Sequence, residues 1–190
     1  MVDEPFIEVI GETVAVLERI GIPYAITGSI ASGIHGEPIQ SQDVDIAIRM
    51  TPQQAKELSS QLPLRFYRSA DRLEEVARAG GLANLIDMET TLKIDLSVLA
   101  STPFYDAVMR RRSLMEFIPD GPSFYTVTPE DVILMKLLWR KDTQSVKQWE
   151  NALSVARRQG VSMDWKYLFD QARSLGIEKD LVRLRDEAGI

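Results

Sequence analysis

Hydrophobic positions along this chain recur at helical spacing in some stretches and alternate with polar positions in others. Recurrence every three to four residues predicts a helix with one buried face, whereas alternation predicts a strand with one buried face. Gly and Pro residues separate these stretches. The expected helices are residues 5–20, 29–34, 51–62, 71–79, 103–112, 131–141, 145–159, 164–175 and 178–187. The expected strands are a short one from residue 24 and residues 43–48, 64–67, 83–88, 91–99, 114–118 and 124–127.

The pattern changes near residue 128. Helices and strands alternate before it, whereas only helical spacing remains after Thr128-Pro129-Glu130-Asp131, which has the cap, proline and acidic first turn of a helix start. The pattern therefore predicts an α+β domain over residues 1–127, with a mixed sheet flanked by helices. A C-terminal helical bundle is expected over residues 128–190. The length of 190 residues suits one domain with such an addition.

Two stretches of the first domain carry candidate chemistry. Residues 24–29 form an apolar run ending in Gly28-Ser29, which suits a buried strand that turns sharply into a helix. Backbone N–H groups at such a helix start attract an anion, for instance phosphate. Asp43 and Asp45 lie two residues apart in an alternating run, so a strand places both carboxylates on one face, about 7 Å apart. A cation relieves their repulsion, and oxygen ligands select Mg²⁺ or Mn²⁺ over zinc.

Gly-Ser, a spacer and Asp-apolar-Asp together resemble the signature of the nucleotidyltransferase-fold superfamily, the group of DNA polymerase beta-like enzymes. That family also has a third carboxylate on a later strand, and Asp95 lies in a suitable alternating run. The resemblance implies a nucleotidyltransferase-fold sheet and a catalytic, metal-binding triad of Asp43, Asp45 and Asp95. It also implies nucleotide binding by Gly28 and Ser29. An isolated Asp-x-Asp pair is common in turns and caps, so the prediction rests on the combination.

The helical part supplies two candidate cations. Residues 132–140 are apolar almost all round, which predicts a buried helix, and Lys136 and Arg140 lie one turn apart on it. The Thr-Pro-Glu-Asp start and the embedded lysine resemble minimal bacterial nucleotidyltransferases, including the abortive-infection (AbiE-type) toxin group. The resemblance implies that Lys136 faces the nucleotide, and Arg140 is expected at the same outlet as a second nucleotide-binding residue. The alternative is a lysine that only extends its ammonium to solvent.

Other polar residues have both a structural and a functional interpretation. His35, the chain's one histidine, is expected to pack or cap near the site rather than to act in catalysis. Asp87 is expected at an exposed strand position rather than as a fourth metal ligand. Arg110, Arg111 and Arg112 end a predicted helix, where the dipole favours cations; contact with phosphate or tRNA is the other interpretation.

Composition excludes several kinds of site and location. The chain has no cysteine, so disulfides, thiolate metal sites and a cysteine nucleophile are ruled out. The acidic N-terminus lacks a signal-peptide pattern, and the longest apolar run, residues 132–139, is too short to span a bilayer. A cytoplasmic protein without a membrane partner is therefore expected. The net charge of -6 argues against broad electrostatic binding of nucleic acid.

The resemblance implies an enzyme that uses Mg²⁺ or Mn²⁺ to move an NMP from an NTP to an acceptor hydroxyl. The sequence leaves the acceptor open between a tRNA end, a protein side chain and a small hydroxylated molecule. A narrower version is the toxin of a toxin–antitoxin pair, with an antitoxin protein as partner. Ile39 stands where relatives carry arginine, and Asn151 where they often carry aspartate. These departures keep open a nucleotide-binding regulatory module without turnover. A third hypothesis is a protein-interaction domain in which the helical tail matters.

Overall fold

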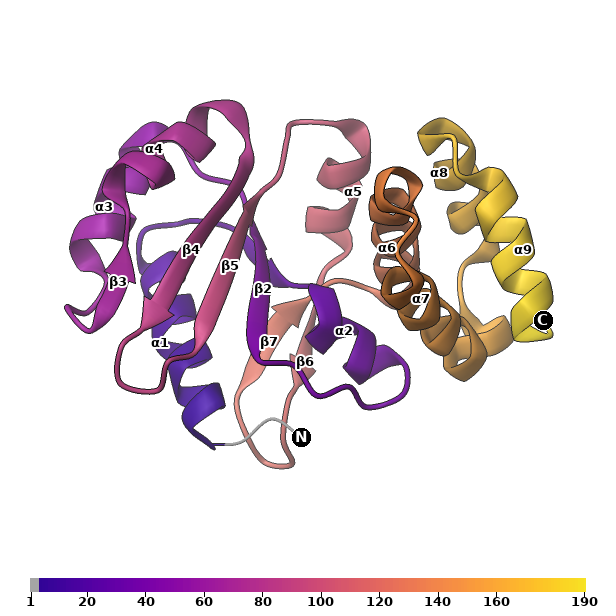
Figure 1. The fold of residues 1–190 in the computed structure, drawn as a ribbon, viewed down its shortest axis with the longest axis horizontal. Coiled ribbons are helices and arrows are strands. Elements are labelled where there is room, and N and C mark those ends of the chain that lie inside the picture. The colour runs from indigo at the N-terminus through magenta and orange to yellow at the C-terminus, as the bar shows by residue number, and fades with distance from the viewer. Residues whose placement is uncertain (1–3) are drawn as a thin grey trace.

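The computed structural model of the protein describes residues 4–190; the first three residues, including Asp3 of the acidic N-terminus, lie outside this range. The helices are α1 (Glu4–Arg19), α2 (Gly28–His35), α3 (Pro52–Gln61), α4 (Ala70–Ala79), α5 (Pro103–Arg111), α6 (Pro129–Thr143), α7 (Val146–Gln159), α8 (Trp165–Leu175) and α9 (Glu178–Ala188), with a short 3-10 helix η1 (Gly160–Ser162). The strands are β1 (Tyr24–Ile26), β2 (Asp43–Ile48), β3 (Phe66–Arg68), β4 (Gly81–Asp87), β5 (Lys93–Val98), β6 (Ser113–Glu116) and β7 (Ser123–Thr126). The sheet lies at one end of the molecule and helices α6 to α9 gather at the other (Figure 1). This confirms the predicted α+β fold with C-terminal helices.

The seven strands form one mixed sheet in the order β3-β4-β5-β2-β1-β7-β6. β2 pairs in parallel with β5, and β1 with β7, while the other neighbouring strands are antiparallel. In the β2–β5 pair, Asp45 is the partner of Asp95, and Asp43 is the partner of Lys93. Paired residues of adjacent strands point to the same face of a sheet, so all four of these side chains share one face.

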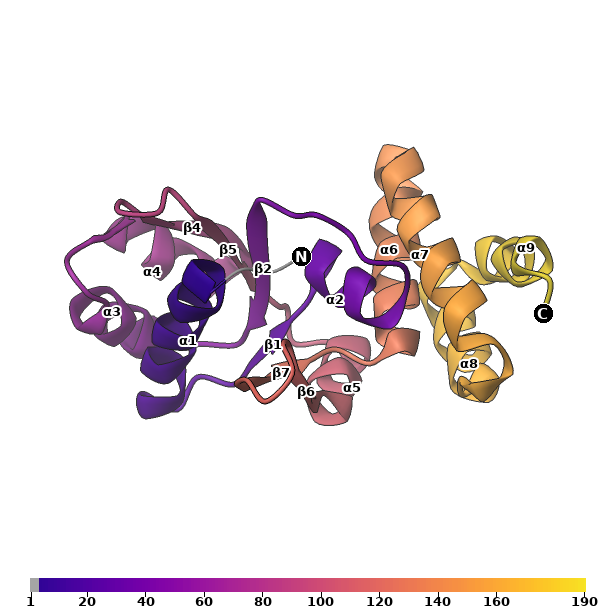
Figure 2. The same cartoon turned by 90° about the horizontal axis from the view of Figure 1, so that it is seen from below.

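The opposite face of β2 belongs to the first of two hydrophobic cores. Val44, Ile46 and Ile48 are completely buried, as their alternation with the aspartates predicts. They share this core with apolar side chains of α1, α3 and α4. Figure 2 shows α1 and α3 on one side of β2, β4 and β5. Burying the apolar face in this way leaves the acidic face of the sheet available for a site.

The second core lies between the sheet and the C-terminal helices. It contains apolar side chains from α6, α7, α8 and α9, together with Ala25 of β1 and Val127. Phe104 and Val108 of α5 also belong to it, although α5 precedes residue 128. The predicted division at residue 127 therefore passes through a shared core, and two separate domains remain a prediction. No helix in the described range has the length and apolar character needed to cross a bilayer.

Polar capping explains where two of the helices begin. Thr51 and Gln54 form a reciprocal capping box at the start of α3. The Thr128 hydroxyl accepts a hydrogen bond from the Asp131 backbone N–H at 3.3 Å and so caps α6. Both starts match those predicted from the sequence.

A buried polar network joins α5 to the C-terminal helices. Arg111 Nη2 lies 3.0 Å from Glu130 Oε2, and Arg111 Nε lies 3.5 Å from Asp131 Oδ2. The Tyr167 hydroxyl of α8 donates to Asp131 Oδ1 at 2.7 Å, and the Arg111 guanidinium lies 3.9 Å from the Tyr167 ring centroid. Arg111 therefore has the stabilising role that was one of its two sequence-based interpretations.

The environment of Asp87 differs from the one expected from the sequence. The prediction of an exposed strand position is wrong, because Asp87 is completely buried. Its carboxylate accepts a hydrogen bond from the Thr90 hydroxyl at 2.7 Å and pairs with Arg65 Nε at 3.1 Å. It thus stabilises the turn between β4 and β5, a structural role that sequence alternation alone does not reveal.

Candidate active site

The three predicted aspartates meet on the acidic face of the sheet. The parallel register aligns Asp45 with Asp95, and Asp43 lies two residues before Asp45 on the same face. Burial raises the pKa of Asp45, the Lys136 charge opposes this shift, and the charges of Asp95 and Asp43 add to it. The carboxylates are therefore close enough to affect one another electrostatically.

Gly28 allows the start of α2 to approach Asp45. Its φ is 65°, a left-handed conformation that favours glycine, and a Cβ at this position would lie 1.8 Å from Asp45 Oδ2. The Ser29 backbone N–H donates a hydrogen bond to the Asp45 carboxylate, which lowers its pKa. The sequence predicted close approach of the backbone to a ligand at this turn. In the structure the group that comes close is the carboxylate of Asp45.

Lys136 of α6 lies opposite these carboxylates. It is only 3% exposed, so it does not extend into bulk solvent as the alternative interpretation requires. Burial lowers its pKa to about 8, an effect that Asp45 opposes and Lys147 adds to. Its Nζ also lies 5.5 Å from the Trp139 ring centroid. Lys136 is therefore a desolvated cation within electrostatic reach of Asp45.

Arg140 lies in different surroundings. Its Nη1 is 3.6 Å from Asp180 Oδ1 of α9, and its guanidinium lies 5.0 Å from the Trp149 ring centroid. These contacts hold it among the C-terminal helices, and it is not among the residues that line the cleft containing Lys136. The structure therefore separates the two cations that the sequence placed at one outlet, and nucleotide binding by Arg140 stays a prediction.

Two residues that the sequence analysis missed contact Asp95. Lys93 Nζ lies 2.8 Å from Asp95 Oδ2 and 3.9 Å from Asp43 Oδ2. The Asn84 side-chain amide donates to Asp95 Oδ1 from the neighbouring strand β4. The hydrogen bond with Asp95 raises the pKa of Lys93. Lys93 could have been found from its spacing, because a residue two before Asp95 on a strand shares its face.

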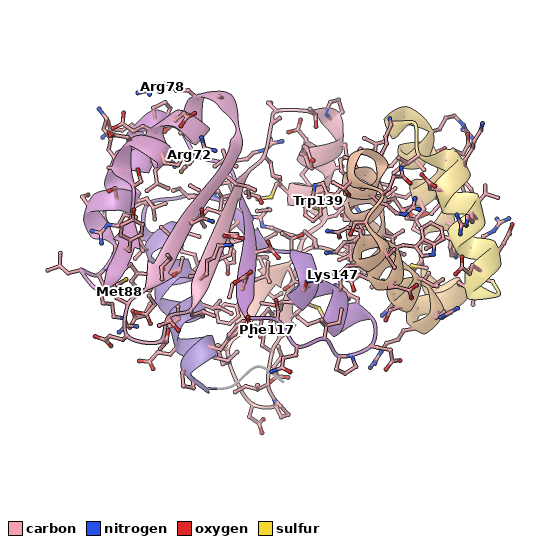
Figure 3. All side chains as sticks on the ribbon, in the orientation of Figure 1. Arg72, Arg78, Met88, Phe117, Trp139 and Lys147 are labelled. Carbon is pink, nitrogen blue, oxygen red and sulfur yellow. The ribbon has the colours of Figure 1, made fainter. Side chains whose placement is uncertain are left out.

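A cleft of about 750 Å³ separates the acidic face of the sheet from α6 and α7. Ser29, Asp43 and Asp45 line it on one side, and Lys136, Trp139 and Lys147 line it on the other. Trp139 and Lys147 are labelled in Figure 3 at the edge of α6 and α7 that faces the sheet. Its volume is in the range of pockets that hold small ligands.

Comparisons with known proteins identify the fold. No protein-family model matches the sequence, and no curated protein sequence matches it either. A solution structure of the antibiotic-resistance factor ANT(2'')-Ia matches with a TM-score of 0.54 and 12% identity, covering 95% of this chain and 98% of that one. A nucleotidyltransferase-like antigenic protein from Paracoccidioides brasiliensis matches with a TM-score of 0.55 and 17% identity, covering 98% of this chain and 94% of that one. The chain has the nucleotidyltransferase fold.

ANT(2'')-Ia in complex with adenylyl-2''-tobramycin matches as well, with a TM-score of 0.54 and 13% identity over 88% of this chain and 97% of that one. The TM-scores establish the nucleotidyltransferase fold, and the low identities leave the reaction to be argued from the residues themselves.

The donor atoms in this nucleotidyltransferase fold suit a hard cation, but they do not form a ready-made cage. In the described part of the chain, no three carboxylate or histidine side chains converge closely enough to hold a metal ion. The Lys93 ammonium instead contacts Asp43 and Asp95. The carboxylate oxygens are the right ligands for Mg²⁺ or Mn²⁺. A cation bound by all three would have to displace Lys93.

His35 lies at the far end of α2, away from these groups. Its side chain is buried and its Nε2–H donates to the Val127 carbonyl at 2.8 Å. Burial lowers its pKa, which favours the neutral imidazole. His35 therefore packs in the interior, as expected, but at the end of α2 that lies away from the aspartates.

Proposed function

We propose that this protein is a metal-dependent nucleotidyltransferase that moves an NMP from an NTP to an acceptor hydroxyl. The observation that carries the proposal is the surroundings of Asp45. Its carboxylate faces two further aspartates, the N-terminal turn of α2 and the buried cation Lys136 across the cleft. Phosphoryl chemistry needs this combination of carboxylates, backbone N–H groups and a cation around one point.

The phosphate-binding part of the proposal uses α2 and α6. Gly28 and Ser29 begin α2 beside the cleft, where N–H groups and the helix dipole favour an anion. Lys136 supplies a positive charge from the opposite wall. A desolvated ammonium binds phosphate more strongly than an exposed one because water screens it less. The triphosphate of an NTP is therefore expected between these two walls.

The three aspartates would bind the metal ion and accept a proton. Asp43 and Asp45 would hold Mg²⁺ or Mn²⁺, with Asp95 as the third ligand of the predicted set. When bound, the metal neutralises phosphate charge and helps to orient the phosphoryl group. Asp95 would otherwise accept the proton of the attacking hydroxyl. Its partners Asn84 and Lys93 hold its carboxylate in a fixed position.

A nucleotide-binding regulatory module without turnover is the second candidate. The contacts of Lys93 with Asp43 and Asp95 support it, because a lysine that neutralises these carboxylates competes with a metal ion. The toxin version, with an antitoxin partner, is supported only by the sequence motif around Lys136.

Label transfer from each α-labelled NTP, with Mg²⁺ or Mn²⁺ and candidate acceptors, tests the enzyme directly. Asp45→Asn is expected to lower transfer by about 100-fold or more while the melting temperature is kept, because a partly buried carboxylate at the reacting centre is lost. Asp186→Asn on the exposed side of α9 is the matched control and should transfer normally. NTP binding without transfer in the wild type would favour the regulatory module. Unchanged activity in Asp45→Asn would contradict the site.

A further inference from the structure

Asp43 borders two cavities. One is the cleft that also contains Lys136, and the other is a separate cavity of about 640 Å³. The second cavity is lined by the start of α1, the start of β2 and the turn between β4 and β5. These three segments lie at the same end of the sheet (Figure 1). A transfer between two substrates requires two binding spaces that meet near the reacting groups, and these two cavities meet at Asp43.

Charge decides which cavity suits the nucleotide. The cleft has Lys136 and Lys147 on one wall and the Ser29 end of α2 on the other. The second cavity has a single lysine in its lining, Lys93, whose ammonium already contacts Asp95 and Asp43. A triphosphate carries several negative charges and needs cations and N–H donors. The nucleotide therefore suits the cleft, which leaves the second cavity for the acceptor.

The lining of the second cavity indicates the chemical class of that acceptor. Pro5, Phe6, Ile86 and Leu92 make much of it apolar. Its other members are the neutral Gln42, Thr90 and Thr91 and the pair of Asp43 and Lys93. One acid and one base favour neither a polycation, which needs several carboxylates, nor a polyanion, which needs several basic side chains.

The surroundings of this cavity argue against a nucleic acid as well. Arg65, just before β3, reaches the end of β4 and the following turn, but Glu12, Asp87 and Glu89 hold its guanidinium at 2.9, 3.1 and 3.8 Å. That cation is therefore neutralised by the protein. We propose that the second cavity receives a neutral small molecule with an apolar part and a hydroxyl group, and that this hydroxyl is the acceptor. This inference rests on the proposed nucleotidyltransferase function.

The acceptor oxygen attacks the α-phosphorus of the NTP and forms a new O–P bond. The bond between the α-phosphorus and the oxygen that bridges to the β-phosphorus breaks, and pyrophosphate leaves with that electron pair. The hydroxyl proton passes to the Asp95 carboxylate, which lies beside Lys93 of the cavity lining, and from there to water.

Two tryptophan substitutions on β4 distinguish the roles of the two cavities. Ile86 lines the second cavity and Leu82 lines the cleft, and both lie on the same face of β4. Ile86→Trp is expected to lower label transfer by about tenfold or more, while the NTP dissociation constant stays within about twofold. Leu82→Trp should instead weaken NTP binding. Gln42→Trp repeats the first test at a more exposed position of the same second cavity, since Ile86 is half-buried and Gln42 is exposed.

The acceptor class is tested with α-labelled NTPs and a cell extract divided into five pools: neutral, cationic and anionic small molecules, total tRNA and protein. Transfer to the neutral small-molecule pool is expected. Label in any other pool, or NTP binding without transfer to the neutral pool, overturns the acceptor assignment while nucleotide binding stands. Normal transfer by both Ile86→Trp and Gln42→Trp overturns the assignment of the cavity. A wild-type protein that binds no NTP overturns the proposed function itself, and the inference with it.

Discussion

At the scale of single residues, Lys136 shows how burial prepares a charged group for a ligand. Its ammonium is desolvated and faces Asp45, while Lys147 adds a second positive charge to the same cleft. Burial has lowered its pKa to about 8, so near neutral pH the group is charged but poorly solvated. A phosphate in the cleft would supply the negative charge that the folded protein only partly provides.

The lowered pKa of Lys136 predicts that NTP affinity and the stability of the folded protein change in opposite directions as pH rises. NTP affinity should fall as pH rises through about 8, because the ammonium loses its proton there. Unfolded lysine keeps its proton to a higher pH, so wild-type stability relative to Lys136→Met should rise between pH 8 and the usual lysine range. Calorimetric titrations and thermal melts from pH 7 to 10 measure both.

Lys136→Arg is the control for this pH dependence. An arginine keeps its charge over the whole range, so its NTP affinity should not fall through pH 8. If the wild type and Lys136→Arg lose affinity in parallel, another group is responsible for the pH dependence.

At the scale of elements, the start of α2 depends on the close contact between Gly28 and Asp45. Gly28→Ala is expected to lower the free energy of unfolding by about 1–3 kcal/mol, because of its positive φ and the clash with Asp45. It should also weaken NTP binding, since the turn must move away from Asp45. Chemical denaturation and calorimetry measure the two effects.

Gly11→Ala is a matched control for that substitution. Gly11 lies inside α1, and a Cβ there meets nothing within 4 Å. This change should raise stability by about 0.5–1 kcal/mol through helix propensity. If the two substitutions changed the free energy of unfolding equally, the contact between Gly28 and Asp45 would not explain the effect of Gly28→Ala.

Local patterns predicted the elements and much of the site because alternation and helical spacing act over neighbouring residues. Asp43 and Asp45 are an example, since one strand fixes their common face. The structure also brings Asp95 to that face, as the family resemblance implied. Asn84 and the partners of Arg140 depend on pairing between segments distant in the sequence, so no local pattern revealed them. Asp87 shows the same limit, because the cation that pairs with its buried carboxylate is Arg65, from the turn before β3.

At the scale of the whole molecule, the network around Arg111 connects the sheet region to the C-terminal helices that carry Lys136. Arg111→Met is expected to lower the free energy of unfolding by about 2–4 kcal/mol, because Glu130 and Asp131 would stay buried without their cation. The neighbouring Arg110 is exposed, so Arg110→Met should change stability by no more than about 0.5 kcal/mol. Denaturant unfolding of both variants measures the difference, and similar values would show that the network contributes little.

The pairing of β4 with β5 has a consequence for how the site assembles as the chain folds. These two strands are neighbours in the sequence and pair antiparallel, whereas the contact of β5 with β2 joins distant segments. Hairpins form from local contacts, and long-range pairing costs more chain entropy, so the β4–β5 hairpin is expected to form first. Asn84, Lys93 and Asp95 all lie on that hairpin. The third carboxylate can therefore reach β2 with its charge already balanced, which lessens the repulsion that docking beside Asp45 would otherwise meet.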